Sequence, residues 1–238
     1  MSKNYQYNAS SKKNQLSSPA FTMIELVFAI VLLGILAAMA LPRIERDTRQ
    51  EAADNILSAI RYTQHLALMD NKIDNNNPLG AKNWHRAFWQ MRFANNGGEW
   101  QYIIASNNNY DANLNKATES ALDPVNGKYI YASNANPASD ESPNSFLSKK
   151  YGIDNVDFTA CNGQVGTSNT GPGTTVRHIA FDYLGRLHRG VFGATDNMST
   201  LMHADCTIEF TFEDGSDDLS IIIRKDTGYA NIVDQNAS

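Results

Sequence analysis

The chain has 238 residues, of which 42% are hydrophobic and 19% are charged. This length and composition suffice for one globular domain with appended segments, and they exclude a chain that is disordered throughout. The formal net charge of −5 at pH 7 counts against a nucleic-acid partner bound through a broad basic surface.

The first predicted element is an apolar run from Phe21 to Leu41, which Thr22 and Glu25 interrupt with polar side chains. A helix needs about 20 apolar residues to cross roughly 30 Å of hydrocarbon, and the run meets that length. It therefore predicts a membrane-spanning helix. A buried core helix is a weaker alternative, because no neighbouring segment could cover apolar side chains on all sides.

A secretory signal peptide is a second alternative for the same run. Lys12 and Lys13 would form its basic region, Leu26 to Leu36 its apolar core, and Ala38-Met39-Ala40 a cleavage site, after which the mature chain would begin. Glu25 counts against this interpretation, because a charge at the start of the apolar core is costly.

The residues Phe21-Thr22-Met23-Ile24-Glu25, followed by the apolar run and by Pro42, resemble the N-terminal signal of type IV pilins and type II secretion pseudopilins. The phenylalanine, the glutamate and the proline stand in the register that this signal has in the family. The resemblance implies that residues 1–20 are a cytoplasmic leader that is removed. It also implies that residues 21–42 are a transmembrane and assembly helix.

The resemblance also implies roles for single residues at this junction. A prepilin peptidase would cleave between Ala20 and Phe21 and N-methylate Phe21, although the family usually has glycine where this chain has Ala20. A buried carboxylate is costly unless it is paired. In the family's manner, Glu25 of one subunit would pair with the Phe21 amine of a neighbour and so set the register of a filament.

Residues 43–73 predict an amphipathic continuation of this helix. Between Ala53 and Leu68, apolar side chains recur at spacings of three and four, with charged and amide side chains in the gaps. Pro42 lacks an amide hydrogen, so we expect it to kink or loosen the helix. The polar segment from Asp74 to Pro78 predicts the helix end.

Residues 74–238 predict a β-rich head. Asn95-Asn96-Gly97-Gly98 separates two strand-like stretches and predicts a hairpin, and Cys206 to Phe212 alternates apolar and polar side chains. Cys161 and Cys206 predict one disulfide if the head is exported. In a cytosolic protein the same pair would be two unrelated buried thiols.

A second resemblance lies in the C-terminal third. The stretch from Ile179 to Arg186, a hairpin, and a terminal Thr227-Gly228-Tyr229-Ala230 strand look like the C-terminal pattern of H-type minor pseudopilins and T-type minor pilins. The family commonly has arginine where this chain has Tyr229. This likeness favours a minor subunit over a major one.

The sequence gives little sign of catalysis or metal binding. Its histidines lack metal-ligand spacing, and it has no hydrolase, zinc-protease or phosphate-loop motif. The acidic cluster from Glu213 to Asp218 offers oxygen ligands for calcium, but its spacing differs from that of an EF-hand, and Asp214-Gly215 already predicts a hairpin turn. We therefore expect no enzyme, no cofactor and no metal.

Arg186, His188 and Arg189 form a short basic cluster at which a DNA contact could be suspected. Phosphate contacts need several basic groups and the net charge is negative, so a solvated turn is the simpler interpretation. A DNA-binding minor pilin of a DNA-uptake filament is the alternative function.

Together these elements predict an α+β, pilin-like fold. A long N-terminal helix, membrane-spanning in its first half, would pack on an antiparallel β-sheet head. The predicted function is that of a minor pseudopilin or pilin-like subunit of a type II secretion pseudopilus or a type IV pilus-like filament. Its expected partners are other such subunits, the inner membrane with its assembly platform, and the prepilin peptidase. Its expected location is the inner membrane, single-pass, with the head in the periplasm.

Overall fold

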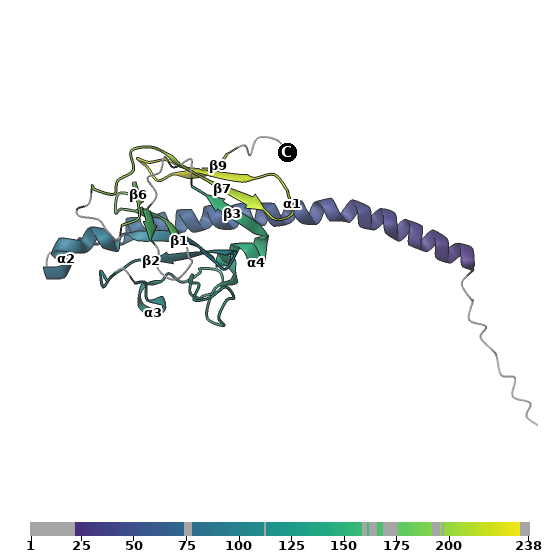
Figure 1. The fold of residues 1–238 in the computed structure, drawn as a ribbon, viewed down its shortest axis with the longest axis horizontal. Coiled ribbons are helices and arrows are strands. Elements are labelled where there is room, and N and C mark those ends of the chain that lie inside the picture. The colour runs from purple at the N-terminus through teal and green to yellow at the C-terminus, as the bar shows by residue number, and fades with distance from the viewer. Residues whose placement is uncertain are drawn as a thin grey trace, which may run out of the picture. The chain divides into compact units, whose positions relative to one another are not determined.

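The structure is a computed structural model that describes residues 22–73, 78–111, 113–158, 161, 166–168, 176–191, 196 and 198–233. The chain divides into two compact units, Met1–Ile44 and Glu45–Ser238. Helix α1 (Met23–Met69) begins in the first unit and ends in the second. The fold is α+β (Figure 1).

The second unit also holds short helices and all the described strands. In chain order these are α2 (Pro78–Asn83), η1 (Trp84–Ala87), β1 (Trp89–Asn96), β2 (Glu99–Ala105), α3 (Lys116–Glu119), η2 (Pro143–Ser145), α4 (Leu147–Tyr151), β3 (Ile153–Asp157), β4 (Gly166–Ser168), β5 (Val176–Phe181), β6 (Leu187–Arg189), β7 (Cys206–Phe212), β8 (Leu219–Ile223) and β9 (Ala230–Ile232).

The described strands form two antiparallel sheets. The first has the order β2-β1-β5-β4, with β6 also paired to β5, and the second has the order β3-β7-β8-β9. Strands β1 and β2 are joined at the Asn95–Gly98 turn and pair in the register Phe93↔Tyr102. Strand β5, far along the chain, pairs with the other edge of β1 in the register Met91↔Ile179.

The part of α1 in the second unit packs on both sheets through one apolar stripe. Its buried side chains recur at helical spacing and belong to the same core as inward-facing side chains of β1, β5 and β7; they are Ala52, Ala53, Ile56, Ala59, Ile60 and Ala67. Small alanines let the sheets approach the helix closely. Hydrogen bonds tie the helix to both sides, from Tyr102 Oη to Asn55 and from Arg61 to the carbonyl oxygen of Ala230.

The membrane-spanning first half predicted from the sequence is wrong. Among the described residues, no helix combines the length and apolar character needed to cross a bilayer. The prediction of one sheet in the head is also corrected, because the strands form two sheets.

A glutamine of α1 joins two turns that lie far apart in the sequence. The side-chain amide of Gln64 donates both of its hydrogens, to the carbonyl oxygen of Gly185 at 3.0 Å and to that of Thr227 at 2.6 Å. These carbonyls belong to the turns at residues 182–186 and 227–229. The two C-terminal stretches that carry the second family resemblance are therefore held on one face of α1.

Gly228 allows the two turns to lie close together on α1. Its φ is +63°, a conformation that residues with a side chain adopt only with strain. A Cβ atom there would also collide with the carbonyl oxygen of Gly185, the amide nitrogen of Gln64 and the ring of Phe181. The close approach of the two turns therefore requires glycine at this position.

Substitution of Gly228 tests this packing. We expect Gly228→Ala to lower the free energy of unfolding by roughly 2–4 kcal/mol, because strain and collision add. Gly215→Ala is the matched control, since Gly215 has a φ of +73° but nothing within 4 Å of its Cβ position. Its expected loss is about 1 kcal/mol. Equal losses for the two variants, measured by urea denaturation of the full chain, would contradict the close approach.

Candidate assembly site

The first turn of α1 is closed by a reciprocal pair of side chains. Thr22 immediately precedes the helix, and its hydroxyl accepts a hydrogen bond from the backbone N–H of Glu25 at 3.3 Å. The carboxylate oxygen Oε2 of Glu25 accepts in return from the backbone N–H and hydroxyl of Thr22, at 3.1 and 3.0 Å. This is a capping box, which satisfies amide donors that a helix start leaves unpaired.

The capping box gives Glu25 a role within a single chain that the sequence analysis missed. The signal was present in the sequence, because Thr-x-x-Glu before an apolar run is the pattern of such a box. Both hydrogen bonds from Thr22 use Oε2 of Glu25. The second oxygen, Oε1, makes no hydrogen bond within the part of the chain that the structure describes.

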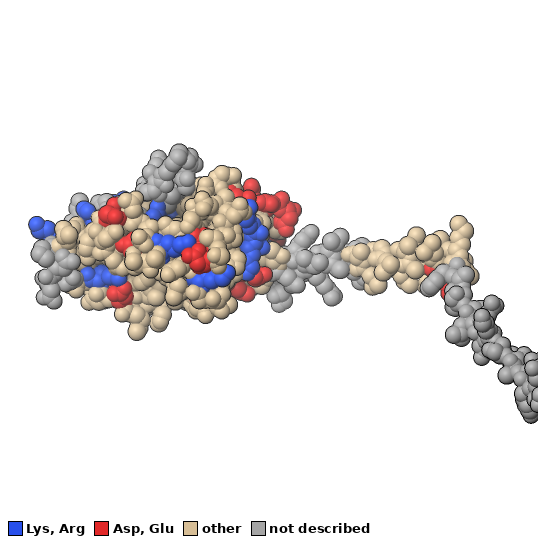
Figure 2. All heavy atoms as spheres, turned by 90° about the horizontal axis from the view of Figure 1, so that it is seen from below, with Lys and Arg blue, Asp and Glu red and all other residues tan. Residues whose placement is uncertain are grey.

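The side chains that follow the capping box are apolar and exposed. Every described side chain from Thr22 to Ala37 is exposed, including Ile24 at 78%, Phe28 at 65% and Leu33 at 63%. Figure 2 shows this segment, between two grey stretches, with few charged atoms. Soluble proteins rarely leave a contiguous apolar surface of this kind uncovered unless another molecule binds it.

The structure describes only some of the other predicted positions of the N-terminal signal. Ala20 and Phe21, between which cleavage is predicted, lie outside the described residues. Pro42 lies within the bounds of α1, where it donates no backbone hydrogen bond because it has no amide hydrogen. The described candidate site therefore consists of the Thr22–Glu25 capping box and the exposed apolar side chains up to Ala37.

At the other predicted site, Arg186 belongs to a turn organised by a buried carboxylate. Asp182 is 1% exposed and accepts hydrogen bonds from the backbone N–H of Leu184 at 3.0 Å and of Arg186 at 2.8 Å. The Arg186 guanidinium forms an ion pair with the same carboxylate at 2.7 Å. Asp182 therefore fixes the shape of this turn and holds the arginine side chain.

The pKa of Asp182 follows from these contacts. Burial raises it, but hydrogen bonds from His188 and from the backbone and side chain of Arg186 outweigh burial, so the pKa lies below its ordinary value of 3.8. The carboxylate is therefore charged at neutral pH and stabilises the folded state there.

His188 is buried, contrary to its interpretation as part of an exposed basic cluster. Its ring lies between the carboxylate of Asp182, 3.4 Å from Nε2, and the hydroxyl of Thr200, 3.0 Å from Nδ1. An acid, an imidazole and a hydroxyl stand in line, as in a hydrolase triad. His188 is 0% exposed and Thr200 is 4% exposed, so a substrate could not reach these side chains. Their contact instead joins β6 to the segment that precedes β7.

The predicted DNA contacts, Arg186 and Arg189, are engaged within the protein. Arg186 pairs with Asp182, and Arg189 donates to the carbonyl oxygen of Ser199 at 2.9 Å. On the face drawn in Figure 2, basic and acidic side chains are interspersed. Neither arrangement resembles the row of free cations that a phosphate backbone requires.

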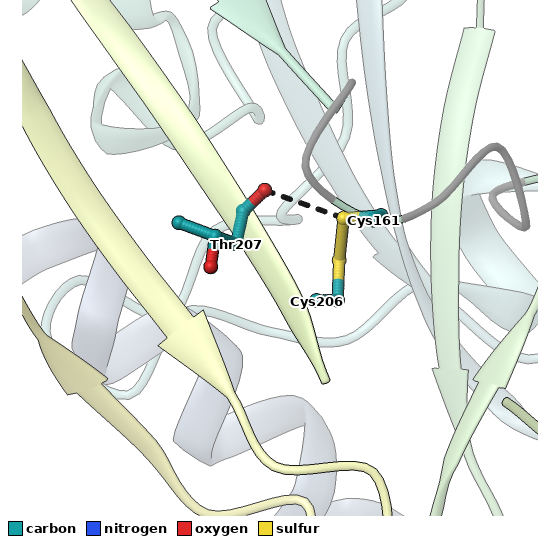
Figure 3. The surroundings of a disulfide bond; sticks show 3 residues. All are labelled: Cys161, Cys206 and Thr207. Atoms are coloured by element: carbon teal, nitrogen blue, oxygen red, sulfur yellow. Dashed lines mark hydrogen bonds between the residues drawn. A yellow bond between two sulfur atoms is a disulfide. The ribbon is translucent and has the colours of Figure 1, made fainter. Parts of the chain in front are cut away.

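The structure contains the disulfide between Cys161 and Cys206 (Figure 3). Both cysteines are 0% exposed and belong to the head's core. Sγ of Cys161 lies 3.3 Å from the carbonyl oxygen of Thr207, on β7. The bond closes a loop of 45 residues and fixes its base to the second sheet, which stabilises the head mainly by restricting the unfolded chain.

The acidic turn between β7 and β8 is held by backbone contacts. Arg49 of α1 donates to the carbonyl oxygens of Asp217 and Asp218, at 2.7 and 2.8 Å, and Asp214 accepts from the backbone N–H of Ser216. Within the described parts of the chain, no group of three or more His, Cys, Asp or Glu side chains is placed to hold a metal ion.

The middle of the chain lines a cleft beside α1. The cleft has a volume of about 170 Å³ and lies between Tyr62 of α1, Tyr102 of β2 and the segment around Asp123. Asp123 accepts hydrogen bonds from Asn126 and Asn144, which orders that segment. The Asp123 carboxylate is therefore engaged in hydrogen bonds within this loop.

Comparisons of the chain with models of known protein families, with curated proteins and with solved structures found no match.

The role of Asp182 predicts a pH-dependent stability difference. Asp182→Asn should lower the free energy of unfolding at pH 7 by about 2 kcal/mol, because it removes charged hydrogen bonds inside the protein. The folded pKa is depressed, so this contribution is complete above pH 3.8 and is lost as pH falls through the lower, folded-state pKa.

Chemical denaturation of both proteins between pH 7 and pH 2 measures this difference. Asp226→Asn serves as the control, because Asp226 is exposed and pairs with Lys225 at the surface, and it should leave stability nearly unchanged. A difference between the parent chain and Asp182→Asn that stays constant down to pH 2 would refute the assignment.

Proposed function

We propose that this chain is a structural subunit of a helical filament, of the minor pseudopilin or pilin-like kind, and that a prepilin peptidase processes it between Ala20 and Phe21. The observation that carries the proposal is the exposed apolar part of α1, opened by the Thr22–Glu25 capping box and continuous with a helix built into the head's core. The resemblance of the N-terminal motif to that of pilins and pseudopilins indicates which kind of filament this is.

An apolar helix of this type is stable only when it is covered. Burial of one leucine, isoleucine or phenylalanine side chain contributes roughly 1.5–3 kcal/mol, and the segment from Met23 to Leu36 exposes many of them. The same segment of other copies offers a matching apolar surface. A bundle of these helices would bury it without a membrane-spanning helix.

Glu25 gives such a bundle its register. Inside an apolar bundle a carboxylate is strongly unfavourable unless a cation meets it. The family resemblance makes the Phe21 amine of a neighbouring copy that cation. The capping box supports this role, because it orients the carboxylate through Oε2, while Oε1 accepts no hydrogen bond from a described residue.

The disulfide supports an exported head. Disulfide bonds persist in oxidising compartments such as the bacterial periplasm and are rare in the cytosol. The location predicted for the head agrees with this chemistry. The alternative function in DNA uptake gains no support from Arg186 and Arg189, since both guanidinium groups already bind partners within the protein.

Two variants of Glu25 separate its charge from its capping role. Glutamine also closes a capping box, so Glu25→Gln keeps the helix start and removes the charge. We expect both Glu25→Gln and Glu25→Ala to reduce the fraction of chain recovered in sedimentable assemblies by about tenfold, equivalent to about 1.4 kcal/mol. The measurement is sedimentation and immunoblotting of extracts from cells that carry the assembly machinery.

The control for this experiment is Glu51→Gln. Glu51 is an exposed acid on the same helix that pairs with Lys150, and its replacement should leave assembly unchanged. Parent-like assembly of Glu25→Gln together with loss in Glu25→Ala would show that only capping matters, and the charge-pairing part of the proposal would fall.

A further inference from the structure

The head carries an exposed patch around Gln64 and the two turns that Gln64 joins. Arg61, Gln64 and Leu68 follow one another at spacings of three and four and share one face of α1. Beside this face lie the two turns that Gln64 holds, which present Leu184 and Tyr229. We call Arg61, Leu68, Leu184 and Tyr229 the turn patch.

Three side chains of the turn patch are exposed hydrophobic groups. Leu68 is 50% exposed, and Leu184 and Tyr229 are each 56% exposed. The parts of the patch are contiguous, because a Cβ atom at Gly185 would lie 3.2 Å from Cδ2 of Leu68 and Gly228 packs against the Gly185 carbonyl. The hydrogen bonds of Gln64 fix the two turns, so the patch is formed before any partner binds.

One cation stands at the edge of this apolar surface. The Arg61 guanidinium donates to the carbonyl oxygen of Ala230 at 2.9 Å and lies over the ring of Tyr229, 5.9 Å from its centroid. No carboxylate within the described ranges forms an ion pair with it. The turn patch thus combines exposed apolar side chains with a positive charge that has no counter-ion there.

The described first part of α1 shares the apolar character of the turn patch and carries the opposite charge. From Thr22 to Ala37 it is apolar and exposed, and Glu25 is the charged residue of that stretch. Glu25 likewise forms no ion pair with a described residue, and a carboxylate can accept hydrogen bonds from more than one cation. The two surfaces complement each other in apolar character and in charge.

We propose that the turn patch receives the first part of α1 of a second copy, with the Glu25 end of that helix next to Arg61. This inference rests on the proposed function, since it requires that copies assemble. It adds to that proposal a docking surface on the head and names the residues that form it. A neighbouring helix on this patch would cover apolar surface on both copies and give Arg61 a counter-ion. Arg61 would then be a second cation at Glu25, beside the proposed Phe21 amine.

Photo-cross-linking of the full-length chain tests the docking surface. A photoreactive phenylalanine replaces Leu184 in one copy, which is co-assembled with isotope-labelled parent chain so that adducts between copies can be recognised by mass. We expect adducts that map to residues 22–37 of the labelled copy. The same probe at Leu122, which is 49% exposed and lies outside the patch, should give no adduct with that segment.

Charge reversal provides the second readout. Arg61→Glu should lower the yield of this adduct about tenfold, whereas Lys149→Glu, which makes the same charge change elsewhere on the head, should leave it unchanged. An adduct yield that Arg61→Glu does not alter would overturn the assignment of Arg61.

Sedimentation of the same samples distinguishes the two proposals. Assembly without adducts to residues 22–37 overturns the docking surface and leaves the filament proposal in place. Adducts that map instead to the acidic turn at residues 213–218 of another copy would do the same, since that turn offers charge without an apolar surface. Absence of any assembly overturns both.

Discussion

The head depends on the burial of one stripe of α1 against two sheets. Ile56 and Ile60 are completely buried, and the alanines around them let strands of both sheets reach the helix. Because α1 is one helix from Met23 to Met69, the same element that forms the core also carries the exposed apolar segment.

Through the hydrogen bonds of Gln64, the C-terminal third of the chain also depends on α1. A single side-chain amide satisfies two turn carbonyls, and Gly228 permits the turns to meet. Asp182 supports the same region from inside by holding the backbone of one turn. These polar contacts fix the two turns that present Leu184 and Tyr229 beside α1. The internal hydrogen bonds therefore also hold the turn patch in place.

The sequence allowed prediction of features set by local pattern and failed on features set by distant contacts. The Asn95–Gly98 turn and the alternation in β7 followed from turn chemistry and period-two spacing. The pairing of β5 with β1, the division into two sheets and the burial of His188 depend on residues far apart in the chain. Nothing in the local pattern marks Gln64 as a bridge between turns. The capping box of Thr22, in contrast, follows from the local Thr-x-x-Glu pattern.

The most direct test of the central claim is the intact mass and N-terminal sequence of the chain isolated from its own host. The account predicts an N-methylated phenylalanine at Phe21, because the assembly helix with Glu25 must be kept in the mature protein. A mature chain that begins at Leu41 would contradict it. The apolar segment would then be a discarded secretory signal, and neither Glu25 nor the turn patch would have the partner proposed here.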